Sequence, residues 1–254
     1  FAATRLRHDL RAPLIGFFQA VAETMIVIVR WVLVAAPIGV FALALGIGLR
    51  TGLDAAGALT QYVLMVSAVT IGALILPYGL VAALRGHDLA RFARACAPVQ
   101  ALAFSTQSSL ACLPAMVERT RDELAAPAQV TGVVLPLAVA VFRMTSPVAN
   151  LAVAFFIIHL YGLEPSAGQI AAAIAVSLAV SVGAVGLPGQ ISFFASMAPI
   201  CLALGAPVEI LAILLAVEVI PDIFRTVGNV TADMAVAAVV RPPDDIAPEL
   251  EAAG

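Results

Sequence analysis

The chain has 254 residues, of which 62% are hydrophobic and 11% are charged, and its formal net charge at pH 7 is −3. Soluble domains carry about 25% charged residues, so this composition excludes a water-soluble protein. Several continuous apolar windows exceed about 18 residues, the length that crosses a hydrocarbon core of about 30 Å. Continuous runs favour helical spans over the alternating strands of a barrel. We therefore expect an all-α integral membrane protein.

The apolar segments follow one another unevenly along the chain. Residues 12–49 and 55–84 predict two long helices. Shorter pieces follow: a first hairpin over 89–117 with a polar tip at Ser105–Ser109, a helix over 127–160 interrupted by "FRMTS", a second hairpin over 166–204 bent at "GAVGLPG", and a last helix over 207–240. The order of a short pair and then a longer helix occurs twice, at 89–160 and at 168–240.

Matching interruptions in two halves are typical of secondary transporters whose site lies at the interface of an inverted repeat. Irregular backbone is tolerated at membrane depth only where it is buried in protein or lines a cavity. All thirteen basic residues are arginine, and most lie before residue 12, at 85–94, at 119–121 and at 241. By the positive-inside rule these loops are cytoplasmic. The two hairpins are then re-entrant from opposite sides.

A stripe of polar side chains runs through the last apolar segment, in "EVIPDIFRTVGNVTAD" at 218–233. Glu218, Asp222, Arg225, Asn229 and Asp233 are spaced by 4, 3, 4 and 4 residues. At 3.6 residues per turn they share an arc of roughly 80° on one helix face. Ionisable residues inside a membrane indicate a functional site. The alternative is a seam of salt bridges between helices.

"DIFRTVGNVTAD" resembles the last-helix motif of the dicarboxylate/amino acid:cation symporter family, the glutamate transporter homologues. "STQSSLACLP" resembles the serine-rich first hairpin of that family, "GLPG" its second-hairpin tip, and "APIGVFAL" at 36–43 a signature near its fifth helix. The resemblance covers nearly the whole chain but not the first four helices of the family. It implies the fifth and sixth helices at 1–86, a transport-domain core at 87–241 and a polar tail at 242–254. A truncated product or a fragment is expected.

The resemblance also implies roles for individual residues. Asp222 matches the aspartate that binds the substrate ammonium, Arg225 the arginine that binds its side-chain carboxylate, and Asn229 an asparagine that bonds its backbone groups. Asn229 and Asp233 match ligands of a sodium ion, and Glu218 supports the site or balances its charge. Further implied substrate contacts are Ser108, Ser109, Ser146, Leu187, Gly189 and Thr226.

One segment departs from the family. Where the family reads NMDGT, this chain has Phe142, Arg143, Met144, Thr145 and Ser146. Met and Phe side chains supply no oxygen for sodium, and a fixed cation repels one. We hypothesise that Arg143 does some of the work of a bound cation, pairing with Asp233, Glu218 or the substrate, while a buried carboxylate such as Glu218 carries a proton. The alternative is that Arg143 only holds helices together.

The resemblance thus predicts a homotrimeric elevator-type symporter among the lipids of a bacterial cytoplasmic membrane. The substrate is a small anion, an acidic amino acid such as aspartate or glutamate, coupled to sodium or protons. We expect no other cofactor, no nucleic-acid partner and no enzymatic activity, because no nucleophile has a base at a suitable spacing. A channel is disfavoured because the polar residues converge on one locus. A C4-dicarboxylate symporter, which the extra charge of Arg143 favours, and a fragment that transports nothing remain alternatives.

Overall fold

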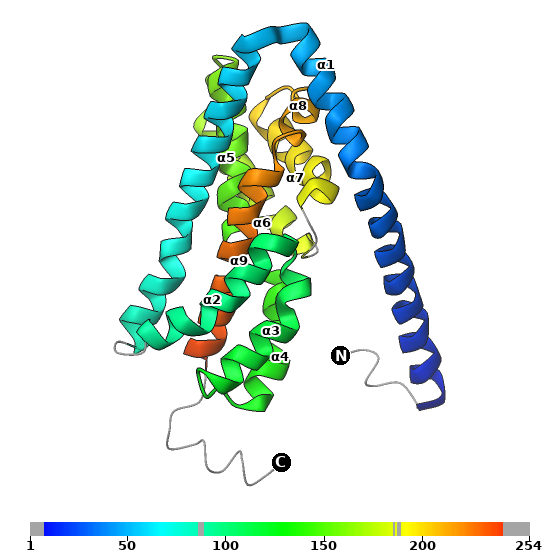
Figure 1. Ribbon diagram of the computed structural model, residues 1–254, viewed down its shortest axis with the longest axis vertical. Helices are drawn as coiled ribbons and strands as arrows, with labels where there is room; N and C mark the ends of the chain where they lie inside the picture. The colour runs from blue at the N-terminus through cyan, green and yellow to red at the C-terminus, as the bar shows by residue number, and fades with distance from the viewer. Residues whose placement is uncertain (1–7, 86–88, 185, 187–188, 241–254) are drawn as a thin grey trace. The chain divides into compact units, whose positions relative to one another are not determined.

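The structure is a computed structural model that describes residues 8–85, 89–184, 186 and 189–240. The regular structure of the described residues is entirely α-helical (Figure 1). In chain order the helices are α1 (His8–Arg85), α2 (Leu89–Thr106), α3 (Ser109–Asp122), α4 (Ala128–Val141), α5 (Thr145–Leu160), α6 (Ala167–Gly183), α7 (Gly189–Leu204), α8 (Leu211–Leu215) and α9 (Val219–Val239). The chain divides into two compact units, residues 1–46 and residues 47–254. The expected tail at 242–254 lies outside the described residues.

The two helices predicted at 12–49 and 55–84 are joined in the structure, because residues 50–54 are helical as well. The junction "RTGLD" holds no proline, and a single glycine inside a helix costs only about 1 kcal/mol. Within the second unit, Ala56–Leu84 is long and apolar enough to cross a membrane. Its large apolar side chains Leu64 and Ile75 are 65% and 67% exposed, as expected of a helix that faces lipid.

The segment Val130–Leu160 also has the length and hydropathy of a membrane span. It consists of α4 and α5, which are separated by the irregular residues 142–144. Pro136 lies inside α4, where it removes one backbone hydrogen bond. The shorter apolar helices Ala167–Gly183 and Ser192–Leu204 follow it along the chain.

Several consecutive helices pack against each other, among them α2 with α3 and α6 with α7. Gln107 connects the first pair with a positive φ of 51°, and the Ser108 hydroxyl caps α3 by accepting a hydrogen bond from Ala111 N. Ser166 begins α6 with a capping box that it shares with Gln169.

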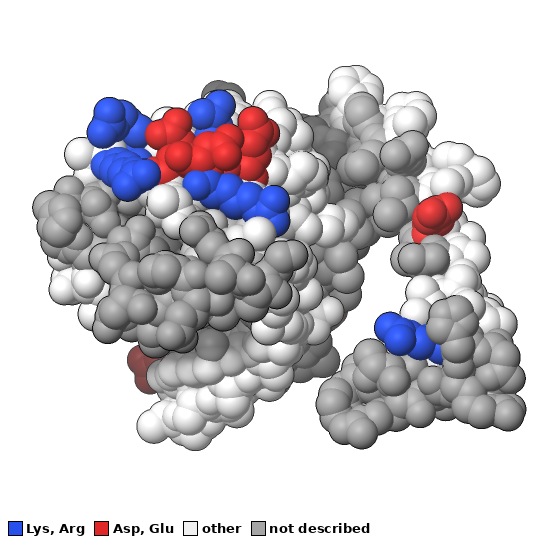
Figure 2. All heavy atoms as spheres, turned by 90° about the horizontal axis from the view of Figure 1, so that it is seen from below, with Lys and Arg blue, Asp and Glu red and all other residues white. Residues whose placement is uncertain are grey.

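The pairing of α2 and α3 brings the start of α2 and the end of α3 together (Figure 1). Charged side chains of both signs gather on one face of the molecule (Figure 2), and at the end of α3 Arg119 forms an ion pair of 3.6 Å with Glu123.

The last helix is shorter than the predicted range of 207–240. It begins with the short α8, and α9 starts only at Val219. Between them, Ala216, Val217 and Glu218 donate backbone hydrogen bonds three residues back instead of four. Pro221 explains this tightened turn, because its ring clashes with the carbonyl of the fourth residue before it, Val217.

Helix α9 is the central element of the second unit. It contacts α2, α3, α4, α5 and α7 (Figure 1). One hydrophobic cluster surrounds Tyr62, Phe156 and Phe193, and a second includes Phe92 and Met234. Because α9 is packed on several sides, its polar face is directed into the protein and not toward lipid.

We expect the substitution Gly228→Ala to lower thermal stability. A Cβ at Gly228 would overlap Thr145 Cγ2 and lie 3.0 Å from Thr145 Oγ1, and overpacking costs about 1–3 kcal/mol. Alanine is the better helix former by about 1 kcal/mol, so steric overlap must outweigh propensity. The measurement is the melting temperature in detergent. Gly132→Ala in α4 is the control, because a Cβ there meets nothing within 4 Å; equal melting temperatures for the two variants would contradict the prediction.

Candidate functional site

The polar stripe of the last helix is buried along its whole length. Glu218, Asp222, Arg225, Thr226, Asn229 and Asp233 are each at most 5% exposed. A buried charge is costly unless it is paired and hydrogen-bonded. The partners that the surrounding helices supply therefore determine what this face of α9 can do.

Three charged residues of the stripe form a connected network, which we call the Arg225 network: Glu218, Asp222 and Arg225. Arg225 Nη2 donates a hydrogen bond of 2.7 Å to Glu218 Oε1. Arg225 Nη1 lies 3.8 Å from Asp222 Oδ1. The hydroxyl of Tyr62, on α1, donates to the second oxygen of Glu218. One guanidinium thus holds two carboxylates.

The second oxygen of Asp222 is held by a backbone group at the start of α7. Gly189 N donates a hydrogen bond of 2.7 Å to Asp222 Oδ2. A Cβ at Gly189 would overlap Asp222 Oδ1 and lie 2.7 Å from its Cγ. Only glycine therefore permits this close approach.

Asn229 is held by the start of α5, directly after the irregular residues 142–144. Its Oδ1 accepts hydrogen bonds from Thr145 N at 3.0 Å and Thr145 Oγ1 at 2.8 Å. Its Nδ2 donates to Ser146 Oγ at 3.1 Å. Thr145 Oγ1 also lies 2.7 Å from the Arg225 carbonyl oxygen. The interruption between α4 and α5 is thereby fixed against α9.

The connection between α2 and α3 meets the connection between α6 and α7. Ser108 Oγ donates a hydrogen bond of 2.8 Å to the Gly186 carbonyl, and Leu110 N donates to the same oxygen at 3.2 Å. Gly186 is thus bonded to Ser108, and Gly189, three residues later, is bonded to Asp222. Leu187, an expected substrate contact, lies outside the described residues. Ser109 is 2% exposed, and its hydroxyl has no hydrogen-bond partner in the part of the chain that the structure describes.

Arg143 and Asp233 are the remaining buried charges. Arg143 is 7% exposed and interacts electrostatically with Asp222, Asp233 and Arg225. Neither carboxylate oxygen of Asp233 has a hydrogen-bond donor among the described residues. Asn229 and Asp233 are the expected sodium ligands. Both carboxylate oxygens of Asp233 accept no hydrogen bond from the described residues, whereas Asn229 Oδ1 already accepts two from Thr145. Within the described ranges no three His, Cys, Asp or Glu side chains gather as a metal site.

Three contributors to the site were missed by the sequence analysis. Tyr62 is one of several hydroxyl residues in the span Ala56–Leu84, so its sequence position alone does not single it out as a partner of Glu218. Thr145 was noted in the departing segment but not assigned to the site. Gly186 contributes a carbonyl, and sequence carries little information on where a backbone oxygen points.

The sequence profile of the sodium:dicarboxylate symporter family matches residues 1–242. The chain belongs to this family. It is 30% identical over 230 residues to the proton/glutamate-aspartate symporter of Escherichia coli K12, covering 91% of this chain and 52% of that protein. It is 31% identical over 229 residues to a proton/sodium-glutamate symport protein of Bacillus subtilis, covering 90% and 52%. It is 29% identical over 224 residues to human neutral amino acid transporter A, covering 87% and 42%.

The chain spans about half the length of the curated relatives it matches. The family consists of integral membrane transporters, which agrees with the apolar helices of the structure. The sequence-based assignment to the family is therefore confirmed.

We expect Glu218→Gln to destabilise the protein more than Tyr62→Phe does. Removing one partner of a buried ion pair costs about 3–5 kcal/mol, whereas losing one buried hydrogen bond costs about 1–3 kcal/mol. Melting temperatures in detergent should fall in the order wild type, Tyr62→Phe, Glu218→Gln. Glu118→Gln, an exposed carboxylate in α3, is the control for loss of one negative charge. A Glu218→Gln protein as stable as this control would contradict the ion pair.

Proposed function

We propose that the protein is a secondary active symporter that carries an acidic amino acid, such as aspartate or glutamate, together with a cation. One observation carries the proposal. Arg225 Nε and Asp222 Oδ1 are buried and have no hydrogen-bond partner among the described residues. They are a guanidinium donor and a carboxylate acceptor without a hydrogen bond in that part of the chain, on adjacent turns of α9, and Arg225 Nη1 approaches Asp222 Oδ1 only to ion-pair distance, 3.8 Å. Buried polar atoms are nearly always bonded, so the pair indicates a ligand with both a carboxylate and an ammonium group.

The Arg225 network can bind such a ligand without being taken apart. A guanidinium has five N–H donors in a fixed fork, and Glu218 uses one of them. Arg225 therefore keeps donors for a substrate carboxylate, a geometry that carboxylates match well. Asp222 is anchored through Oδ2 by Gly189, which leaves Oδ1 for the ammonium group. The bacterial relatives, a glutamate–aspartate symporter and a glutamate symport protein, support the same substrate class.

The remaining substrate contacts surround this pair in the proposal. Asn229, Thr226 and Ser146 lie on or against the polar face of α9, and Asn229 and Ser146 are bonded to each other. Ser108, Ser109, Leu187 and Gly189 come from the two connections, which Gly186 joins. The buried Ser109 hydroxyl is available to a substrate carboxylate. A substrate held there would be enclosed by backbone groups from both sides.

A C4-dicarboxylate is the second candidate substrate, and the position of Arg143 favours it. Arg143 and Arg225 are both buried and interact electrostatically with each other. Two guanidiniums suit a ligand with two carboxylates and no amine. Asp222 opposes this reading, because its free oxygen would then face an anion.

We further propose that the α2–α3 and α6–α7 pairs are re-entrant hairpins of an inverted repeat that open the site to opposite sides of the membrane. Residues 87–241 form the transport-domain core in this proposal, and the N-terminal helices belong to the scaffold of a homotrimeric elevator in the cytoplasmic membrane. Both helix pairs and their direct contact through Gly186 support this arrangement. Coupling to sodium or protons follows from the net negative charge of the Arg225 network, which has two carboxylates and one guanidinium.

Uptake by the purified protein in proteoliposomes tests the proposed function. Labelled L-aspartate and labelled succinate are each supplied with a sodium gradient, with a proton gradient, or with neither. We expect cation-driven aspartate uptake that unlabelled succinate inhibits weakly. Absence of concentrative uptake of either compound would overturn the proposal, and preference for succinate would support the dicarboxylate alternative.

We expect Asp222→Asn to raise the KM for aspartate at least about 30-fold, because losing one partner of a buried charge pair costs at least about 2 kcal/mol. Succinate transport should be retained or improved, since the amide no longer repels a second carboxylate. Glu118→Gln, at an exposed carboxylate of α3, is the control for loss of one negative charge. An unchanged aspartate KM in the Asp222→Asn protein would remove Asp222 from the ammonium site.

A further inference from the structure

Asp233 is a buried carboxylate that the Arg225 network does not reach. It lies eight residues after Arg225 on α9, about 12 Å along the helix axis at 1.5 Å per residue. It is 0% exposed, and both of its oxygens lack a hydrogen-bond donor among the described residues. An ionised carboxylate in such surroundings is costly unless a positive charge lies nearby. Arg143 is the charged group that acts on it electrostatically.

The backbone around Arg143 is fixed next to the Asp233 turn of α9. On one side of Arg143 in sequence, Thr145 N is bonded to Asn229, one turn before Asp233. Its immediate neighbours Phe142 and Met144 line an apolar cavity of about 240 Å³ together with Ala232, Ala235 and Val236 of α9, and with Leu76, Pro77 and Leu80 of α1. Residue 143 is therefore bracketed by residues that lie against positions 229–236.

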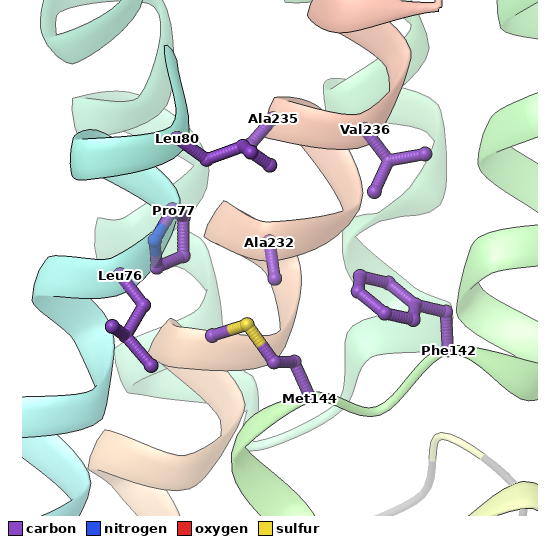
Figure 3. A pocket seen from close by; sticks show the side chains of 8 residues that line it. All are labelled: Leu76, Pro77, Leu80, Phe142, Met144, Ala232, Ala235 and Val236. Atoms are coloured by element: carbon purple, nitrogen blue, oxygen red, sulfur yellow. The ribbon is translucent and has the colours of Figure 1, made fainter. Parts of the chain in front are cut away.

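Side-chain directions separate Arg143 from this apolar cavity. Figure 3 shows the side chains of Phe142 and Met144 directed into the cavity, Phe142 toward α9 and Met144 toward Leu76 of α1. Arg143 lies between these two residues in sequence but is buried and does not line the cavity. Asp233 follows Ala232, about 100° further around α9, and does not line it either. Phe142 and Met144 thus line the cavity. Arg143, between them in sequence, is buried outside the cavity and interacts electrostatically with Asp233.

We propose that Arg143 is a built-in counter-cation of Asp233 and takes the place of one mobile cation in the charge balance of the protein. The role of Arg143 in transport rests on the proposed function, whereas its pairing with Asp233 does not depend on whether the protein transports anything. The buried charges of the described part are three carboxylates and two guanidiniums. With Arg143 assigned to Asp233, that end of the site is neutral, and the Arg225 network keeps one net negative charge.

The test measures cation binding without substrate, so it is independent of whether uptake is observed. Melting temperatures are recorded in detergent in sodium chloride and in choline chloride at equal ionic strength. Any difference between the two salts for the wild-type protein should be unchanged in Asp233→Asn, because a sodium ion at the Glu218 end does not involve Asp233. Arg143→Met should melt several degrees lower in choline and regain the loss in sodium. Arg143→Lys, which keeps the positive charge, should behave like the wild type.

The double variant Arg143→Met/Asp233→Asn makes the assignment specific. Removing both charges should restore the melting temperature in choline and return the response to sodium to that of the wild type, because the coupling energy of a true pair appears in the double-mutant cycle. This result would hold even if Arg143→Met alone failed to fold. Three results would overturn the proposal: a wild-type response to sodium that Asp233→Asn abolishes, an Arg143→Met protein without any response to sodium, or a double variant no more stable than Arg143→Met.

Discussion

Burial of charge on α9 is the constraint on which the rest of the structure depends. A helix whose backbone is fully bonded has no spare N–H groups for the carboxylates and amide on its own face. The donors come from the first residues of neighbouring helices, whose N–H groups have no partner within their own helix. Thr145 N at the start of α5 bonds Asn229, and Gly189 N at the start of α7 bonds Asp222. The interruptions that look like defects in the apolar segments are therefore the source of the hydrogen bonds that keep this polar face inside the protein.

Close packing makes these backbone donors effective, and glycine makes the packing possible. The Gly189 amide reaches Asp222 because no Cβ stands between them, and Gly228 admits Thr145 directly against α9. Each contact fixes one irregular segment to the same helix, the first through α7 and the second through α5. Movement of either segment must then change the hydrogen bonding of the Arg225 network or of Asn229. The site and the conformation of the surrounding helices are thus mechanically connected.

The sequence predicted the order of the helices and the polar stripe, because both are local patterns: apolar runs of sufficient length, and polar residues spaced by three or four. It did not predict the partners. Tyr62 lies 156 residues from Glu218, a contact set by how α1 packs and not by any spacing. The helical junction at 50–54 and the tightened turn before α9 were also missed, the first because a single glycine is a weak breaker and the second because Pro221 acts on the carbonyl four residues earlier. Leu187, predicted from the tip motif, lies outside the described residues.

Charge balance connects the two ends of the site. If Arg143 neutralises Asp233, the negative charge that remains lies with Glu218 and Asp222 around Arg225. An acidic amino acid also carries one net negative charge, so its binding there would raise the uncompensated charge in a region of low dielectric, where like charges repel strongly. A cation that enters with the substrate must then act at the Glu218 end, where Tyr62 already holds one carboxylate oxygen. In the proposed symporter, coupling would follow from this charge balance, because a substrate anion and a cation near Arg225 each compensate the charge of the other.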